Sequence, residues 1–193
     1  MRICIYGASA DAPARPYFDA ARELGAELAQ RGHVLVFGGG RGGLMGACAE
    51  GAAAQGGEIV GIAPRFFDEP GILYDRCTRL IYTETLRERK QRMEEESDAF
   101  VVLPGGIGTW EEFFETLTLK QLGRHAKPMA VLNTLGYYER MLDMLRSAAD
   151  GGFMSRACLR LFGLCATPSE ALEHVEKAEI LRGNLRRLAD YSR

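Results

Sequence analysis

The sequence lacks the patterns that mark a disulfide framework, a zinc site or a membrane span. Its five cysteines are odd in number and contain no C-x-x-C pair, and its three histidines are scattered. No apolar run approaches the roughly 20 residues needed to cross a bilayer, and the apolar start is too short for a signal peptide. We therefore expect free buried thiols in a cytoplasmic protein without a metal or another cofactor.

The sequence also lacks an excess of charge of either sign. Lysine and arginine total 24 and the acidic residues 26, which gives a formal net charge of −2. A chain this close to neutrality has no bulk attraction for nucleic acid or an anionic membrane, so we expect neither as a partner. Any anion must be bound by a local site. The length of 193 residues fits one domain, residues 1–193.

Short apolar runs alternate with longer amphipathic stretches along the chain. The expected strands are residues 3–6, 34–37, 59–62, 79–82, 99–103, 129–132 and 161–166. The expected helices are residues 16–30, 44–54, one opening at Thr85, 109–122, 137–149, one capped by Thr167, and a basic surface helix after Gly183. This alternation predicts an α/β fold, a single-domain Rossmann-like doubly wound parallel sheet with helices on both faces.

A glycine-rich loop, residues 38–46, lies between an expected strand and an expected helix. Glycines let backbone N–H groups approach a phosphate, and the helix N-terminus adds partial positive charge. The loop satisfies G-x-G-x-x-G, but a dinucleotide site wants an acidic residue about 20 residues on, and Ile62, Ala63 and Pro64 stand there. No Walker Gly-Lys-Ser/Thr follows either, so NAD and a P-loop are both disfavoured.

A second loop of the same kind, residues 104–112, follows the apolar run 99–103. The carboxyl ends of neighbouring parallel strands meet at one edge, so the two loops can face one ligand across a crevice. The alternative interpretation is that both loops are only tight strand-to-helix turns.

Two charged residues are candidates for chemistry. Glu112 could stabilise positive charge on a bound ribose, as glycoside cleavage through an oxocarbenium-like transition state requires. Alternatively, Glu112 forms a capping box with Thr109. Arg89 lies in a charged run that would ordinarily be a solvated helix face, but it shares a face with Met93 and is expected to lean inward. A guanidinium can hydrogen-bond a leaving base or a phosphate.

Three motifs together resemble the Lonely Guy family. Residues 39–46 (GGRGGLMG) are similar to its G-G-x-x-G-L-M-G loop, and residues 104–112 (PGGIGTWEE) to its P-G-G-x-G-T-x-E-E signature. Residues 88–93 (ERKQRM), followed by Ser97-Asp98-Ala99-Phe100, resemble its E-R-K-x-x-M…D-A-F stretch. The resemblance covers roughly residues 2 to 150 and extends to Gly136-Tyr137-Tyr138.

The resemblance implies a phosphoribohydrolase that cleaves the N-glycosidic bond of AMP or an N6-substituted AMP, a cytokinin riboside 5′-monophosphate, to free base and ribose 5-phosphate. It places Arg89 and Glu112 at catalytic positions and implies a homodimer or higher homo-oligomer. The expected substrate-binding residues are Ser9, Gly39, Gly40, Gly43, Met45, Lys90, Gly105, Gly106, Ile107, Gly108, Thr109, Glu111 and Thr118.

The sequence departs from the family pattern at Leu86, Arg87 and Trp110, and in Tyr6-Gly7-Ala8-Ser9 at the end of the first strand. These departures leave open the choice between AMP and an N6-prenylated analogue. A nucleotide-binding or sensing module of the same fold, without catalysis, is the alternative function. Sequences of this kind have also been labelled lysine decarboxylases, but the four lysines lie in no Schiff-base context.

Overall fold

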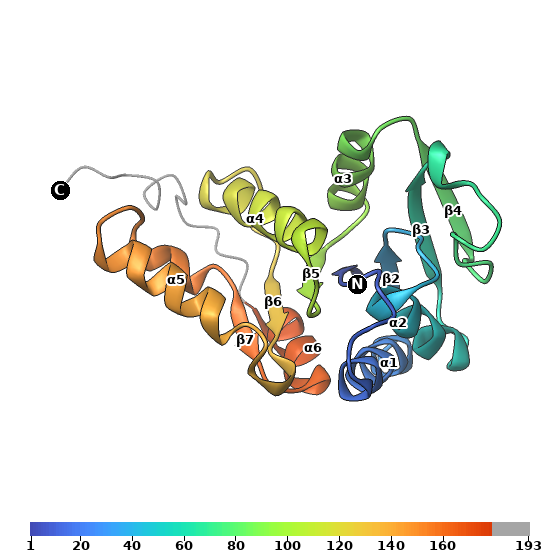
Figure 1. Ribbon diagram of the computed structural model, residues 1–193, viewed down its shortest axis with the longest axis horizontal. Helices are drawn as coiled ribbons and strands as arrows, with labels where there is room; N and C mark the ends of the chain where they lie inside the picture. Colours follow the sequence, from blue (N-terminus) through green and yellow to red (C-terminus); the bar gives the residue numbers. More distant parts are fainter. Residues whose placement is uncertain (179–193) are drawn as a thin grey trace.

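The computed structural model describes residues 1–178, and these contain one seven-stranded sheet (Figure 1). The strands are β1 (Arg2–Tyr6), β2 (Val34–Phe37), β3 (Ile59–Pro64), β4 (Arg79–Thr83), β5 (Ala99–Val102), β6 (Met129–Leu132) and β7 (Gly163–Cys165). Their order is β4-β3-β2-β1-β5-β6-β7, and every pairing is parallel. The predicted doubly wound parallel sheet is confirmed.

The strand order reverses at β1, which pairs with β2 on one side and β5 on the other. In an open parallel sheet, the crevice at such a reversal opens at the carboxyl ends of the strands. The loops after β1, β2 and β5 all leave from that edge. The two glycine-rich loops predicted from the sequence therefore lie on either side of the loop after β1.

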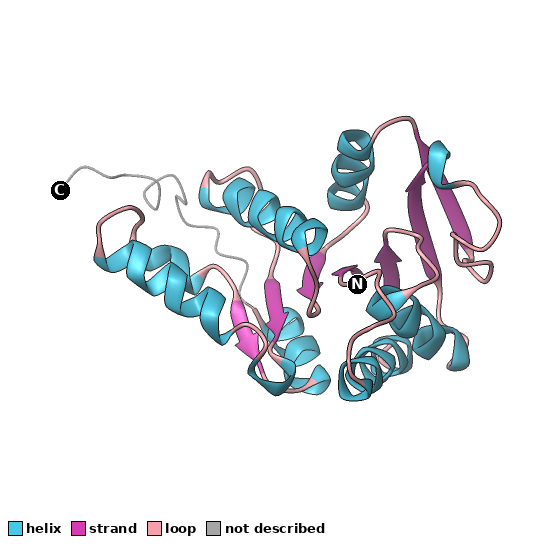
Figure 2. Ribbon diagram, viewed as in Figure 1, coloured by secondary structure: helices cyan, strands magenta, loops and turns pink. Residues whose placement is uncertain are grey.

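Helices cover both faces of the sheet (Figures 1 and 2). The long helices are α1 (Arg15–Gln30), α2 (Gly43–Ala54), α3 (Leu86–Glu95), α4 (Ile107–Gln121), α5 (Glu139–Asp150) and α6 (Pro168–Lys177). Helices α1, α2 and α6 share one hydrophobic core with the sheet, and α3, α4 and α5 share the other. Three short 3₁₀ turns lie in the connections, namely η1 (Arg65–Phe67), η2 (Thr134–Gly136) and η3 (Arg156–Arg160).

Several element boundaries differ from the sequence predictions. Helix α4 begins at Ile107 rather than Thr109, with Gly106 as its N-cap in an extended conformation. Helix α5 begins at Glu139 rather than Tyr137, since the η2 turn and its αL residue Leu135 precede it. Strand β7 is three residues long rather than six. The predicted basic helix after Gly183 lies outside the described residues.

All five cysteines are free, and all but Cys77 are buried, which agrees with the predicted buried thiols. Burial raises the pKa of the Cys4 and Cys48 thiols to about 12, so these two are unreactive at neutral pH. Within residues 1–178, no helix combines the length and the apolar character needed to cross a bilayer.

Lys120 on α4 is buried beneath η3, with 5% of its surface exposed. Its ammonium group donates a hydrogen bond to the Leu161 carbonyl at 2.7 Å. Desolvation lowers the pKa of Lys120 to about 8, because a buried ammonium loses its hydration and no carboxylate of residues 1–178 pairs with it. The charged form therefore costs stability below that pH.

Wild-type protein should accordingly gain stability relative to Lys120→Met as the pH rises. The folded-state pKa lies below the ordinary value of 10.5, so the gain begins near pH 8 and is complete above pH 10.5. Denaturant unfolding of both proteins at pH 7.5 and pH 10 should show the difference in unfolding free energy moving by about 1–3 kcal/mol in favour of wild type. A difference that does not change with pH would contradict this account.

Candidate active site

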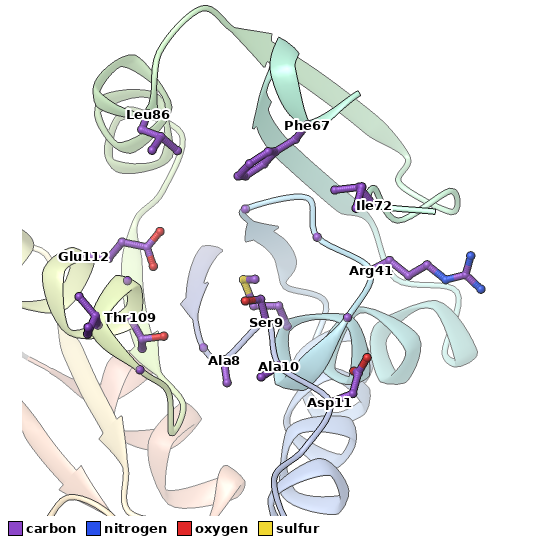
Figure 3. Close-up of a pocket in the computed structure, with 18 of the residues that line it drawn as sticks. Ala8, Ser9, Ala10, Asp11, Arg41, Phe67, Ile72, Leu86, Thr109 and Glu112 are labelled. Carbon is purple, nitrogen blue, oxygen red and sulfur yellow. The ribbon is translucent and has the colours of Figure 1, made fainter. Parts of the chain in front are cut away.

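A cavity of about 690 Å³ opens at the carboxyl edge of the sheet, where the strand order reverses (Figure 3). The loops after β1, β2 and β5 line it, together with the N-terminal part of α3 and the segment after η1. In Figure 3, Glu112 and Thr109 project from α4 on one side, with Ser9 and Asp11 across from them. This volume is ordinary for a small-molecule site.

Arg89 and Glu112 form an ion pair in the wall of this cavity. The Arg89 Nη1 donates to Glu112 Oε1 at 2.9 Å, and its Nε donates to the Ile62 carbonyl at 3.2 Å. Both side chains are buried, at 8% and 7% exposed. Burial raises the pKa of Glu112 above its ordinary value, while the charge of Arg89 opposes that rise. The inward orientation predicted for Arg89 is confirmed.

The capping-box interpretation of Glu112 is wrong. Helix α4 has Gly106 as its N-cap, so Thr109 lies inside the first turn and Glu112 in the second. The Glu112 carboxylate therefore cannot cap the helix, and it faces Arg89 instead. Glu111 also lies beyond the first turn for the same reason.

Gly38, at the end of β2, gives Arg89 the space to reach Glu112. A Cβ atom at Gly38 would lie 1.8 Å from Nη2 of Arg89, far inside van der Waals contact. The guanidinium thus lies directly against the backbone of β2, where only glycine fits. The first glycine of the G-x-G-x-x-G pattern therefore makes room for the Arg89 side chain, rather than for a ligand.

The first three amides of α2 already have acceptors within the protein. The Gly43 N–H donates to Asp11 Oδ1 at 2.7 Å. The N–H groups of Leu44 and Met45 both donate to the Ala8 carbonyl, at 2.8 and 3.3 Å. The loop after β1 therefore occupies the amides at the N-terminus of α2, where the sequence suggested a phosphate. These amides are not available to a ligand in this structure, so only the second of the two glycine loops offers free amides within the described chain.

The N-terminus of α4 is arranged differently. Its N-cap, Gly106, provides no side-chain cap. Within the described chain, the N–H groups of Ile107, Gly108 and Thr109 have no acceptor. These three residues and Gly106 line the cavity. Unsatisfied amides at a helix N-terminus bind anions, so the second glycine loop supplies the anion-binding end of the cavity.

The structure brings some of the predicted residues to the cavity and not others. Those that line it are Ser9, Gly40, Met45, Arg89, Gly106, Ile107, Gly108, Thr109 and Glu112. Those outside its lining are Gly39, Gly43, Lys90, Gly105, Glu111 and Thr118. Lys90 pairs with Glu111 and Glu115 on the outer side of α3 and α4, and Thr118 is exposed one turn further along.

Several lining residues were not among the predicted substrate-binding residues. Phe67, Gly71 and Ile72 come from the segment after β3, which has no regular pattern. Hydrogen bonds tie this segment to the first glycine loop, from Arg41 N–H to the Ile72 carbonyl and from Tyr74 N–H to the Gly39 carbonyl, both at 2.9 Å. No local sequence signal announces such a long-range pairing. The others are Gly7, Ala8, Ala10, Asp11, Gly38, Arg41, Gly42 and Leu86.

The chain is similar in sequence to curated phosphoribohydrolases over most of its length. It is 36% identical to the probable cytokinin riboside 5'-monophosphate phosphoribohydrolase LOGL3 of Oryza sativa subsp. japonica, over 91% of this chain and 83% of that protein. It is 35% identical to the cytokinin riboside 5'-monophosphate phosphoribohydrolase LOG2 of Arabidopsis thaliana, with the same coverage. The chain belongs to this family. The family is the Lonely Guy family that the motifs indicated.

A family model described as "Possible lysine decarboxylase" matches residues 45–175 of this Lonely Guy member. None of its four lysines lines the cavity. Lys90 and Lys177 are in ion pairs, while Lys120 and Lys127 donate to backbone carbonyls. No lysine is therefore placed to form a Schiff base at this site, and the residues do not fit decarboxylation through pyridoxal phosphate.

Solved structures with the same architecture include proteins with other titles. The molybdenum cofactor binding protein of Rippkaea orientalis aligns with a TM-score of 0.70 at 20% identity, covering 91% of this chain and 94% of that one. The molybdenum cofactor carrier protein of Chlamydomonas reinhardtii aligns with a TM-score of 0.69 at 24% identity, covering 91% and 96%. At these identities the similarity concerns the fold alone.

Gly38→Ala should displace the Arg89 guanidinium and so raise the pKa of Glu112, because Arg89 lowers that pKa in the wild type. A ¹³C NMR titration of the Glu112 carboxyl should show a pKa higher than in the wild type. Gly40→Ala is the matched control, since its Cβ meets only the Met45 methyl at 3.4 Å. An equal Glu112 pKa in both variants and wild type would refute the role given to Gly38.

Proposed function

We propose that this protein is a phosphoribohydrolase that hydrolyses the N-glycosidic bond of AMP or an N6-substituted AMP, releasing the free base and ribose 5-phosphate. The observation that carries the proposal is the buried Arg89–Glu112 pair in the wall of a cavity whose other end is a set of free helix amides. The names of the curated relatives agree with it.

The 5′-phosphate binds at the N-terminus of α4. Three free N–H groups converge there, and the helix dipole adds partial positive charge. Thr109 is buried against the same loop and contributes a hydroxyl within the cavity lining. At α2, by contrast, the Asp11 carboxylate already holds the Gly43 N–H and would repel a phosphate. The phosphate therefore fixes which end of the nucleotide lies near Glu112.

The Glu112 carboxylate acts on the ribose. As the bond between C1′ and the base nitrogen lengthens, its electron pair leaves with the base and positive charge develops on the sugar. A carboxylate in a buried site stabilises that charge more strongly than water would. Water then adds to C1′ and gives up a proton, and a carboxyl with a raised pKa is a better acceptor for it.

Arg89 acts on the leaving group. Its guanidinium lies 2.9 Å from Glu112, so the pair presents a positive and a negative end to the same cavity. Cleavage of the glycosidic bond also separates charge, with the cation on the sugar and the anion on the base. The pair is already oriented before the reaction, so little reorganisation is needed as these charges develop.

The base lies among apolar side chains. Met45, Phe67, Ile72 and Leu86 are large apolar residues of the cavity lining. They suit a purine carrying a hydrocarbon group on N6. The names of the relatives give cytokinin riboside 5'-monophosphate as the substrate of those proteins. Of the departures from the family pattern, Leu86 and the segment Gly7-Ala8-Ser9 line the cavity, whereas Arg87 and Trp110 do not.

The protein acts as a homodimer or higher homo-oligomer in the cytoplasm, without bound nucleic acid or membrane. Trp110 on α4, Leu122 at the C-cap of the same helix and Met144 on α5 expose between 42% and 54% of their surfaces. Both helices cover the same face of the sheet, so these apolar groups lie on one side of the molecule.

Sedimentation velocity should give a mass of at least twice the chain mass of 21.3 kDa, and Met144→Glu should lower the measured mass. A wild-type monomer at high concentration would contradict this proposal.

The activity is tested by incubating the protein with AMP and with N6-isopentenyl-AMP, each alone. Chromatography should show free base and ribose 5-phosphate in equal amounts. Glu112→Gln should lower kcat by about 10²–10⁴-fold, since it removes the charge that stabilises the sugar cation. Glu115→Gln, an exposed carboxylate further along the same helix, is the matched control and should retain activity.

The alternative function gives a different result in the same assay. A nucleotide-sensing module would bind AMP tightly and release no base from either nucleotide. That outcome would reject the proposed enzymatic function. The ratio of kcat/KM for the two nucleotides sets the preferred base, and the apolar lining predicts the N6-substituted one.

A further inference from the structure

The backbone of the second glycine loop is held by hydrogen bonds to three consecutive carbonyls. The Tyr138 hydroxyl donates to the Leu103 carbonyl at 2.7 Å, and the Ala8 N–H donates to the Pro104 carbonyl at 3.1 Å. The Tyr137 hydroxyl donates to the Gly105 carbonyl at 2.6 Å. Two of the three donors are adjacent tyrosines that precede α5, more than 30 residues away in the sequence.

These bonds determine where the amides of the loop point. In a trans peptide, the carbonyl of one residue and the N–H of the next lie in one plane and point in opposite directions. All peptide bonds of the described chain are trans. The Tyr137 hydroxyl therefore fixes the Gly106 N–H on the side of the peptide opposite to the tyrosine. Gly106 lines the cavity, whereas Tyr137 and Gly105 do not.

The two tyrosines differ in what they can orient. The carbonyl that Tyr138 holds belongs to Leu103, and the next residue is Pro104, which has no N–H. The hydrogen bond from Tyr138 therefore fixes the position of the loop but does not orient any N–H group toward the cavity. Tyr138 is also a core residue, at 1% exposed, whereas Tyr137 is 38% exposed and contacts the ring of Tyr17 edge-on at 6.0 Å.

Gly105 shows how little freedom the loop has. A Cβ at this residue would lie 2.1 Å from Thr109 Oγ1 and 2.9 Å from the Ala8 nitrogen. The peptide that Tyr137 holds is thus confined between Thr109 and the loop after β1. The Tyr137 hydroxyl binds the carbonyl of this same residue.

We propose that Tyr137 is a positioning residue that aims the Gly106 amide at the substrate's 5′-phosphate, while Tyr138 serves folding stability. This inference rests on the proposed phosphate site at α4. The roles of the two adjacent tyrosines can therefore be distinguished by experiment. Loss of the Tyr137 hydroxyl should weaken ligand binding, whereas loss of the Tyr138 hydroxyl should lower the stability of the fold.

The test uses Tyr137→Phe and Tyr138→Phe, with Tyr17→Phe as the control that keeps the same ring contact. Tyr137→Phe should raise KM for the nucleotide by about 5- to 20-fold, as expected for a weakened hydrogen bond to a charged group, with kcat changed less than about twofold. The Kd for ribose 5-phosphate, measured by calorimetry, should rise by the same factor. Tyr138→Phe should lower Tm more than Tyr137→Phe, because it leaves a buried carbonyl without a donor.

A second readout locates the effect at the phosphate. The corresponding nucleoside lacks that group, so Tyr137→Phe should leave its kcat/KM unchanged, and Tyr17→Phe should match wild type in every assay. Equal losses on nucleotide and nucleoside, or ribose 5-phosphate affinity equal to wild type, would overturn the proposal. Calorimetry does not depend on turnover, so a wild type that binds ribose 5-phosphate but releases no base would reject the enzymatic function and leave this inference to be judged on binding.

Discussion

The site depends on the Arg89–Glu112 ion pair, because that contact holds four elements in one arrangement. Arg89 comes from α3 and Glu112 from α4, and the guanidinium also binds the Ile62 carbonyl of β3. It lies against Gly38 at the end of β2. A buried pair of this kind requires all its partners, since removing one leaves an uncompensated charge. The two residues are 23 positions apart in the sequence, and β5, which lies between α3 and α4 in the chain, pairs with β1 at the reversal point of the sheet.

The two glycine loops show how far sequence alone could reach. Both were predicted at strand-to-helix junctions, and both are found there. Their different roles were not predictable, because those depend on atoms that arrive from elsewhere. Asp11 and Ala8 accept hydrogen bonds from the first three amides of α2. No residue of the described chain accepts from the first three amides of α4. A motif reports where a backbone can approach an anion, while the tertiary contacts decide whether its donors remain free.

The same limit explains the remaining differences. Repeated alternation of apolar runs and amphipathic stretches was enough to predict the parallel sheet and the faces of its helices. The capping-box pattern at Thr109 was misleading because Gly106 begins the helix earlier. Phe67 and Ile72 were missed because an irregular segment reaches the cavity only by pairing with the Gly39–Arg41 backbone. Arg89 was predicted to face inward because its spacing from Met93 is a local property of one helix.

The fold alone is compatible with several functions, and the residues of the cavity reduce the number of reactions that the site can support. A molybdenum cofactor binding protein and a molybdenum cofactor carrier protein have the same architecture, and the description of the matching family mentions lysine decarboxylation. The groups at the reversal point of the sheet favour N-glycosidic cleavage over Schiff-base chemistry: a carboxylate beside a guanidinium, free backbone amides at the other end of the cavity, and no lysine in the lining. Such groups can act without large motion because each is fixed by a core on one or the other face of the sheet. Helix α4 belongs to one core, the loop after β1 leads to α1 in the other, and the Ala8–Pro104 hydrogen bond joins them directly at the site. The arrangement is therefore preorganised by the packing of both layers, which is the condition under which buried charges are most effective in catalysis.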